Sequence, residues 1–541
     1  MNITLDEHSL PAAQLQGRLC LDDSLVDVVS SSRLADDEFP EFLERLRSGR
    51  GEFALVISGG GELRAAVDRL RSIPLFYGTT RSACFVSTNP YWVRSKIGGD
   101  RVDPQGAREL WYMLYVLRDG TLAAGVKQLR PGEALRVVMH PDGPRVTTHA
   151  YYRYINQPCV SEDESELMQE LDRLHLLVFE ELLSSLRDRA IIVPLSGGLD
   201  SRLLVCMLRR LGARDVVCFT YGSGRNLEAR TSRRVAERLG YRWLLVPYGG
   251  RDWNSCFFRQ ARRQFIPFAS RLCALPPLLE DWLAVGLMKR RGDIPADAVF
   301  CPGHTAVFSS GRRALNAAGE TEGLSSLAES ILRSNSPRLR WDRRPESAIS
   351  DIQPRIHRSL QEMASDADSK AFDLGTLLEA WNWSERQSKR IINMTSAYEF
   401  WGYQWRVPLW DARLMDFWGR VPSRLRLSKA LYRRYLAESS ETRFYGLFNG
   451  LRAKAAGNLL PRAGWADVLC RRAQHLSLGR YFLAEKCMER LLVRNCLAFL
   501  SVIGRRVLSS EPVTSPWLLL EQYGIESIWQ GDCQAELAHM S

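Results

Sequence analysis

The chain has 541 residues, of which 45% are hydrophobic and 25% are charged, so it is long enough for two or three domains with full cores. This composition excludes a disordered chain, a collagen and a disulfide-stapled miniprotein. The 73 Lys and Arg residues exceed the 62 Asp and Glu residues by 11. Over this length the excess argues against nucleic acid as a partner, although an anionic substrate such as a nucleotide would fit it.

Twelve cysteines are scattered along the sequence without a Cys-x-x-Cys pair or a His and Cys grouping at zinc spacing. Scattered thiols are typical of a reducing compartment. The N-terminal stretch is mixed and acidic rather than basic and then apolar, and no apolar run reaches membrane-spanning length. We therefore expect a cytoplasmic soluble protein that does not act on a membrane.

Residues 1 to about 155 show short strand patterns separated by turn residues, which predicts a mainly β portion. Two of these strands, 53–58 and 63–67, flank Gly59-Gly60-Gly61 as the arms of a hairpin. The stretch 157–166 is polar and acidic, which is typical of a linker. We therefore predict one domain over residues 1–158 and a second over 165–541.

In the second domain, helical patterns alternate with compact apolar strands, which predicts a parallel sheet with helices on both faces. The expected strands are 191–195, 216–220 and 243–247, and an amphipathic helix over 203–211 joins the first two. Beyond about residue 315 we expect mostly helix. An Arg-rich segment at 334–370 could be mobile or an insertion.

The most informative motif is Ser196-Gly197-Gly198-Leu199-Asp200-Ser201, between a predicted buried strand and the amphipathic helix. Two glycines let the backbone approach a ligand closely, and the N-terminus of the following helix favours phosphate. The serines add hydroxyl donors, and Asp200 can hold a magnesium ion that bridges phosphate oxygens. Since the spacing is neither GxxxxGK[ST] nor GxGxxG, we predict a pyrophosphate site for ATP rather than a kinase-like P-loop.

This loop resembles the signature of the ATP-pyrophosphatase group that includes asparagine synthetases, β-lactam synthetases and lasso-peptide cyclases. Further segments resemble the asparagine synthetase family, and they are Gly51-Glu52-Phe53-Ala54, Asp68-Arg69, Ile73-Pro74-Leu75-Phe76-Tyr77, Leu129-Arg130-Pro131-Gly132, Thr220-Tyr221-Gly222, Arg406-Val407-Pro408-Leu409 with Asp411, and Lys429 with Arg433. Together these segments span residues from about 50 to 435. Within the family, the chain looks closest to members from bacterial surface-polysaccharide clusters.

The resemblance implies an α/β protein in which an N-terminal glutaminase-like (Ntn-type) β-rich sandwich precedes a doubly wound parallel-sheet ATP-pyrophosphatase domain with a helical extension. It implies an amidotransferase-family ligase that adenylates a small-molecule carboxylate and then transfers nitrogen to it from an amine or ammonia donor. ATP and Mg²⁺ are the implied cofactors. The implied nucleotide-binding residues are Leu195, Ser196, Gly197, Gly198, Leu199, Asp200, Ser201, Thr220, Tyr221 and Gly303, with Asp200 as the metal ligand.

Three further residues are candidates for catalysis. His304 could serve as a hydrogen-bonding or acid–base group in place of an acidic residue of the family, or it could be an ordinary loop histidine. Lys429 and Lys454 could each stabilise negative charge during amide formation, although surface ion pairs are the commoner role of lysine.

The sequence departs from the family at two places. Glutamine-using members have a cysteine nucleophile at position 2, where this chain has Asn2, so we expect no glutaminase activity and leave a separate glutaminase partner open. The family's acidic loop residues are replaced by Val307 and Phe308. The alternatives are therefore an intramolecular cyclase of the β-lactam or lasso-peptide type and a catalytically impaired nucleotide-binding member. A homodimer is also left open.

Overall fold

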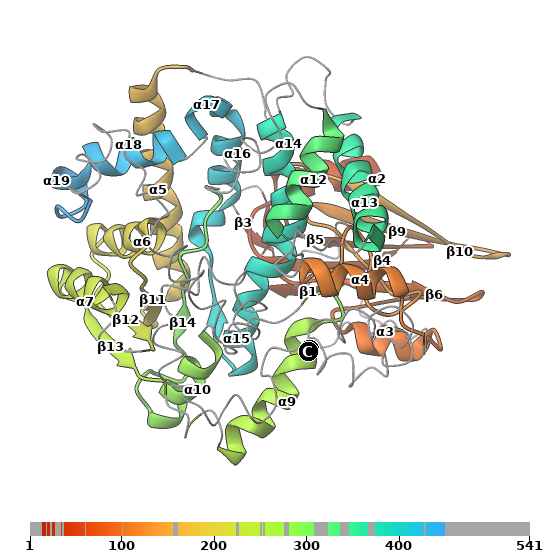
Figure 1. The fold of residues 1–541 in the computed structure, drawn as a ribbon, viewed down its shortest axis with the longest axis horizontal. Coiled ribbons are helices and arrows are strands. Elements are labelled where there is room, and N and C mark those ends of the chain that lie inside the picture. The colour runs from red at the N-terminus through yellow and green to blue at the C-terminus, as the bar shows by residue number, and fades with distance from the viewer. Residues whose placement is uncertain are drawn as a thin grey trace.

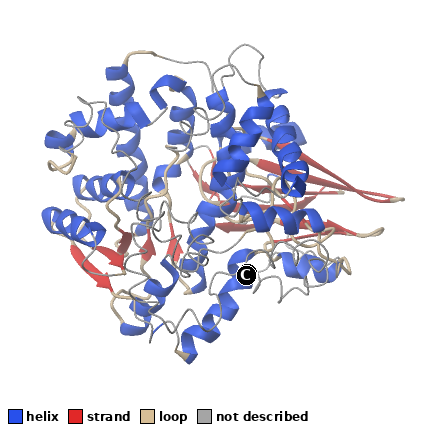
Figure 2. Ribbon diagram, viewed as in Figure 1, coloured by secondary structure: helices blue, strands red, loops and turns tan. Residues whose placement is uncertain are grey.

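The computed structural model describes residues 13–17, 19–21, 24–26, 34, 37–59, 61–99, 101–154, 161–222, 227–248, 252, 255–274, 281–307, 323–335, 346–365, 374–426 and 429–448. It is a mixed α/β structure with two groups of strands. Long antiparallel strands lie on the right in Figure 1, and a parallel sheet lies at the lower left, with helices around and between them. Figure 2 shows the same separation by element type.

The N-terminal half is built on a five-stranded antiparallel sheet in the order β1-β4-β5-β9-β10. Its strands are β1 (Ala13–Gly17), β4 (Phe53–Gly59), β5 (Glu62–Val67), β9 (Glu133–His140) and β10 (Gly143–Ala150). The smaller sheets are β7-β6-β8, formed by β6 (Phe76–Thr79), β7 (Cys84–Ser87) and β8 (Lys127–Gln128), and the pair of β2 (Leu19–Leu21) and β3 (Ser24–Val26). The predicted hairpin is confirmed as β4 and β5.

Both faces of β4 are buried, because its side chains alternate between two cores. Phe53, Leu55 and Ile57 belong to the largest core, whereas Ala54 and Val56 belong to a core shared with the β7-β6-β8 sheet. Hence β4 reads as a continuous apolar run rather than an alternating one.

The N-terminal half was expected to be mainly β, and three of its helices were not predicted. They are α2 (Phe39–Ser48), α3 (Pro90–Lys96) and α4 (Pro104–Met113). Proline in the first turn suits each start, at the first position in α3 and α4 and at the second in α2, since its missing N–H would have no partner there. The Asn89 side chain caps α3 and the Asp103 side chain caps α4. These Asn-Pro and Asp-Pro pairs were visible in the sequence as helix starts.

The predicted linker is wrong over its last residues. Helix α5 (Glu164–Leu186) already begins there, and the Asp163 side chain accepts hydrogen bonds from the backbone N–H groups of Ser165 and Glu166. Acidic residues in the first turn favour the positive end of the helix dipole, so the acidic stretch starts a helix. Residues 155–160 lie outside the described residues.

The second half contains a parallel sheet in the order β13-β12-β11-β14-β15. The three predicted strands are confirmed as β11 (Ile191–Pro194), β12 (Val216–Tyr221) and β13 (Arg242–Val246), and the sheet is completed by β14 (Val299–Phe300) and β15 (Gln404–Trp405). The intervening helices are α6 (Leu199–Arg210), α7 (Leu227–Leu239), α9 (Cys256–Ser270) and α10 (Asp281–Arg291). Since β12 and β14 lie on opposite sides of β11, the strand order reverses there, and ligands of open α/β sheets bind beside the carboxyl ends of strands at such a point.

The C-terminal part of the described chain is mostly helical, as expected. Its helices are α12 (Leu324–Asn335), α13 (Glu346–Ser365), α14 (Leu374–Trp381), the π-helix η2 (Asn382–Ile391), the 3₁₀ helices η3 (Ile392–Thr395) and η4 (Pro408–Trp410), α15 (Ser396–Phe400), α16 (Ala412–Arg420), α17 (Ser423–Arg426), α18 (Ala430–Glu438) and α19 (Ser440–Arg443). Within the Arg-rich segment, α13 buries Ile352, Ile356 and Leu360 and is therefore packed.

The largest hydrophobic core draws on both halves of the chain. Phe42, Phe53 and Tyr151 belong to it together with Ile192 and Trp383. The domain boundary near residue 160 therefore separates two patterns of secondary structure, and it remains a prediction as a boundary between domains.

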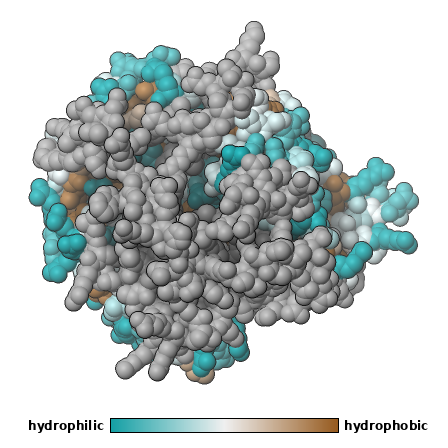
Figure 3. Space-filling view, in the orientation of Figure 1, coloured by the Kyte–Doolittle hydropathy of each residue, from teal (hydrophilic) through white to brown (hydrophobic). Residues whose placement is uncertain are grey.

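The described surface carries only isolated apolar groups. In Figure 3 the coloured residues on this face are mostly hydrophilic, with small separate apolar areas. The large exposed side chains are Met139, Leu177, Phe257, Phe268 and Tyr445. Among the described helices, none has the length and apolar character needed to cross a bilayer.

Candidate nucleotide site

The predicted phosphate loop lies at the carboxyl end of the central strand β11. Leu195 is 1% exposed, and its backbone N–H donates to the carbonyl oxygen of Phe219 on β12 at 2.9 Å. Gly198 is the N-cap residue of α6, and no side chain caps this helix start. The first turn of a twelve-residue helix therefore presents its N–H groups and positive dipole end where β11 stops.

The two serines of the loop hold it in shape. Their hydroxyl oxygens lie 3.0 Å apart, and the Ser196 backbone N–H donates to Ser201 Oγ at 3.2 Å. The Gly198 N–H donates to Ser196 Oγ at 3.1 Å. Since Ser201 is 5% exposed, its main contribution is to fix the loop, and Ser196 is the more accessible hydroxyl.

Residue 303 must be a glycine because it lies directly against this loop. A Cβ atom at residue 303 would lie 2.7 Å from the backbone N of Ser201 and 2.8 Å from its Cα. Both neighbours are backbone atoms that cannot turn away. The predicted residue Gly303 is thus brought against the first turn of α6, and only glycine allows that approach.

Thr220 and Tyr221 lie at the carboxyl end of β12, beside the loop. The Thr220 hydroxyl donates to the carbonyl oxygen of Leu195 at 2.8 Å and also pairs with the Ser232 hydroxyl. It is buried and ties β12 to β11. The Tyr221 ring stacks on Tyr248, with centroids 5.0 Å apart and planes 6° apart.

Sequence reasoning missed a buried carboxylate next to this ring pair. Asp281, the first residue of α10, is hydrogen bonded to the hydroxyls of Tyr398 and Tyr221. Burial raises the pKa of Asp281 to about 6, and the two hydroxyls oppose this shift. An aspartate directly before the apolar run Trp282-Leu283-Ala284-Val285 is the signal that could have identified it.

Asp200 and Lys429 are brought together at the start of α6. The Lys429 ammonium lies 3.1 Å from Asp200 Oδ2. The backbone of Lys429 is in the left-handed region, with φ of 59°. Tyr432, one turn further along α18, lies beside the same carboxylate, and burial together with the charge of Asp200 raises the pKa of Tyr432 well above its ordinary value. Lys454 lies outside the described residues.

The loop after β14 contains two residues singled out in the sequence, the apolar Val307 and the polar His304. Val307 is 7% exposed and belongs to the largest core, while Phe308 lies outside the described residues. The Nε2 atom of His304 is buried and has no hydrogen-bond partner within the described part of the chain. Burial lowers the pKa of His304 to about 4, so the imidazole is neutral at pH 7.

The residues present fit magnesium only as part of a nucleotide complex. No cluster of three His, Cys, Asp or Glu side chains that could hold a metal occurs in the described ranges. Asp200 provides one carboxylate, and Mg²⁺ commonly takes one or two carboxylates and completes its shell with phosphate oxygens and water.

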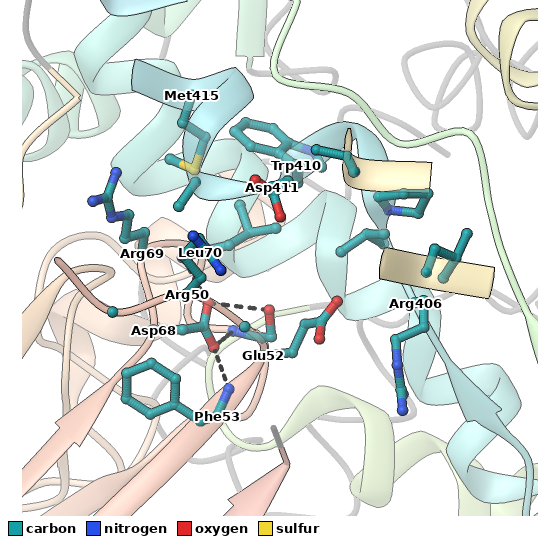
Figure 4. Close-up of a pocket in the computed structure, with 18 of the residues that line it drawn as sticks. Arg50, Glu52, Phe53, Asp68, Arg69, Leu70, Arg406, Trp410, Asp411 and Met415 are labelled. Carbon is teal, nitrogen blue, oxygen red and sulfur yellow. Dashed lines mark hydrogen bonds between the residues drawn. The ribbon is translucent and has the colours of Figure 1, made fainter. Parts of the chain in front are cut away.

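A cavity lies between the two halves of the chain (Figure 4). Glu52 and Arg69 line it from the N-terminal half, and Arg406 and Asp411 line it from the segment after β15. The sequence motifs included these residues without assigning them a common site.

A parallel sheet whose central strand ends at a Gly-Gly turn and an uncapped helix start is an arrangement typical of α/β proteins that bind phosphate groups. Residues 185–443 match the model of the asparagine synthase family. The match covers the phosphate loop, Gly303, the parallel sheet and Lys429.

Solved structures show weaker similarity. Glutamine phosphoribosylpyrophosphate amidotransferase from B. subtilis, complexed with ADP and GMP, is 12% identical with a TM-score of 0.18, over 57% of this chain and 65% of that one. A structure described as the allosteric regulatory enzyme of purine biosynthesis is 12% identical with a TM-score of 0.19, over 61% and 73%. Both similarities are too low to define the fold. No curated protein matches the chain.

Proposed function

We propose that the chain is an ATP-dependent carbon–nitrogen ligase of the asparagine synthase type, which adenylates a small-molecule carboxylate and then joins nitrogen to it. The observation that carries this proposal is the start of α6: an uncapped helix at the end of the central strand, closed by two serines and packed against Gly303. We include in the proposal a glutaminase-like (Ntn-type) sandwich in the N-terminal half and a doubly wound arrangement of the parallel sheet.

In the first step a carboxylate oxygen of the substrate attacks the α-phosphorus of ATP. The bond from that phosphorus to the bridging oxygen breaks, and its electron pair leaves with pyrophosphate. The N–H groups at the start of α6 and the Lys429 ammonium stabilise the leaving charge. When bound, Mg²⁺ held by Asp200 and phosphate oxygens supplies further neutralisation of that charge.

In the second step an amine attacks the carbonyl carbon of the acyl-adenylate. The nitrogen–carbon bond forms as the carbon–oxygen bond to AMP breaks, and the electron pair leaves with AMP. An ammonium donor loses one proton before the attack and a second as the amide forms. With a pKa of about 4, His304 is a weak base, and we assign it a hydrogen bond to the substrate rather than proton transfer.

The nitrogen source follows from the N-terminal half. In the proposed function this half does not hydrolyse glutamine, so nitrogen comes from ammonia, an amine or a separate glutaminase. We place the protein in the cytoplasm, as a monomer or a homodimer. Among the described cysteines, six are free thiols, which suits a reducing compartment, and they are Cys84, Cys206, Cys218, Cys256, Cys273 and Cys301.

A second candidate function is nucleotide binding without turnover. The observation that favours it is the buried Val307, which puts an apolar group where other members have an acidic one. Loss of a carboxylate beside departing pyrophosphate removes charge stabilisation from the transition state.

The test is formation of AMP from α-phosphate-labelled ATP with a panel of carboxylates. We expect carboxylate-dependent AMP from the natural chain, and an Asp200→Asn variant should bind magnesium-ATP at least tenfold more weakly by calorimetry. Asp215→Asn, an exposed change before the start of β12, is the matched control. Binding without AMP would favour the second candidate, and equal binding by Asp200→Asn would contradict the site.

A further inference from the structure

The cavity between the halves is small. Its volume is about 50 Å³. One water-sized group needs about 10 to 15 Å³ measured in this way, so the cavity holds roughly three to five such groups. That is enough for a molecule of about five non-hydrogen atoms.

Most charged groups that line the cavity already have partners. Asp68 accepts hydrogen bonds from three backbone N–H groups, and the remaining pairs are Arg69 with Asp416 at 2.6 Å, Asp411 with Arg413 at 2.8 Å and Glu181 with Arg413 at 2.8 Å. Two groups differ. Glu52 Oε2 and Arg406 Nε are both buried and make no hydrogen bond with any described residue. Buried polar atoms without partners call for a bound water or ligand.

These two groups have opposite charge and reach the cavity from different elements. Glu52 directly precedes β4 and Arg406 directly follows β15, and both line the cavity in Figure 4. They form no ion pair with each other within the described chain. A molecule with an ammonium group at one end and a carboxylate at the other satisfies both. A bare ammonium ion would satisfy Glu52 alone, while facing the guanidinium groups of Arg50, Arg69 and Arg406.

The cavity adjoins the loop that packs against the phosphate site. The charges of both Glu52 and Arg406 act on the Cys301 thiol, whose pKa burial raises to about 12. The Arg406 backbone N–H donates to the carbonyl oxygen of Phe300 at 2.9 Å, and that of Ala306 donates to the carbonyl oxygen of Leu409 at 3.2 Å. The segment 300–306 therefore connects the cavity wall to Gly303 and the start of α6.

We propose that this cavity binds a small amino acid of the size of glycine, with its ammonium on Glu52 and its carboxylate on Arg406, and that this molecule is the nitrogen donor. The binding site stands on the geometry, and the donor role rests on the proposed function. Glu52 is the nearest acceptor for the proton that the ammonium loses before the attack on the acyl-adenylate.

The site is tested by calorimetry on the full chain with glycine, glycinamide and ammonium chloride at constant ionic strength. We expect glycine to bind, and to bind at least tenfold more weakly to Glu52→Gln and to Arg406→Gln. Glycinamide lacks the carboxylate, so its binding should weaken in Glu52→Gln and stay unchanged in Arg406→Gln. Glu44→Gln, an exposed change on α2 with a side chain 64% exposed, should bind glycine as the natural chain does.

Three results would overturn the proposal. Ammonium binding without glycine binding would assign the cavity to a cation, and no binding of either would leave it to water alone. If glycine binding weakened equally in Glu44→Gln, the loss of binding in the cavity variants would not come from the cavity. The donor role is tested separately, because glycine binding without glycine-dependent AMP release retains the site and contradicts the donor role.

Discussion

The Lys429 ammonium lies 3.1 Å from Asp200 Oδ2 and 3.3 Å from Oδ1, so two residues far apart in the chain form an ion pair at the first turn of α6. Asp200 is the predicted magnesium ligand, and its partner is a predicted catalytic cation. A carboxylate already paired with an ammonium group binds a metal only if that group shares it or moves. Under the proposed function, we expect Lys429 to exchange the carboxylate for a phosphate oxygen when a magnesium nucleotide binds.

Replacing Lys429 by methionine tests this exchange. We expect AMP formation to fall at least tenfold, equivalent to about 1.4 kcal/mol of transition-state stabilisation, because the leaving pyrophosphate loses a cation. Single-turnover release of labelled pyrophosphate measures the effect. Arg433→Met, on the exposed face of the same helix, is the control. Equal rates in the Lys429 variant and the natural chain would remove Lys429 from the site.

Replacing Gly303 by alanine tests the packing of the loop. The added Cβ would meet backbone atoms of Ser201 at 2.7 and 2.8 Å, so either the loop or α6 must move, at a cost of about 1 to 3 kcal/mol. We expect ATP affinity to fall at least tenfold by calorimetry. Gly323→Ala is the matched control, since a Cβ there meets nothing within 4 Å. If both variants bind ATP equally, Gly303 is not a constraint on the site.

Stability should fall on mild acidification because of buried histidine. Burial lowers the pKa of His175 from 6.5 to about 4, so between these values the unfolded chain binds a proton that the folded chain does not. The free energy of unfolding then decreases as pH falls through this window, by about 2 kcal/mol from His175 at pH 5. His304 contributes in the same direction. Urea unfolding at pH 7 and pH 5 should show a pH dependence smaller by about 2 kcal/mol in His175→Gln, and an unchanged dependence would contradict the assignment.

A buried ion pair joins the π-helix to the N-terminal half. Lys389 and Glu385 lie 2.6 Å apart with side chains 0% and 2% exposed, and Lys389 also donates to the carbonyl oxygens of Val116 and Arg118 at 3.0 and 2.6 Å. Lys389→Met should reduce the free energy of unfolding by about 3 to 5 kcal/mol, because Glu385 is left buried without its cation.

Denaturant unfolding measures this loss, and adding Glu385→Gln to the same chain should recover part of it. The comparison is Arg333→Met, which removes a surface pair with side chains 45% and 38% exposed and should cost under about 1 kcal/mol. A loss no larger for Lys389→Met than for Arg333→Met would mean that the pair is not held in the folded chain.

Local signals in the sequence were sufficient to predict three strands of the parallel sheet and the loop after the first of them. The three predicted strands are short buried runs, and Ser196 to Ser201 directly follow the first of them, so adjacent residues carry the whole pattern. The cavity could not be predicted in this way, because Glu52 and Arg406 come from opposite halves and meet only through packing. The π-helix was equally hidden, since its i to i+5 pairing leaves no distinct hydrophobic period in the sequence.

The core shared by the two halves makes the folding of each half depend on the other. The Trp383 indole N–H donates to the carbonyl oxygen of Arg69 at 2.8 Å, and the Tyr151 hydroxyl donates to that of Val67 at 2.7 Å. Deleting the first 150 residues would expose the indole and the aromatic side chains around it to solvent. A chain that lost its N-terminal half would therefore also lose part of the core on which its parallel-sheet half is built.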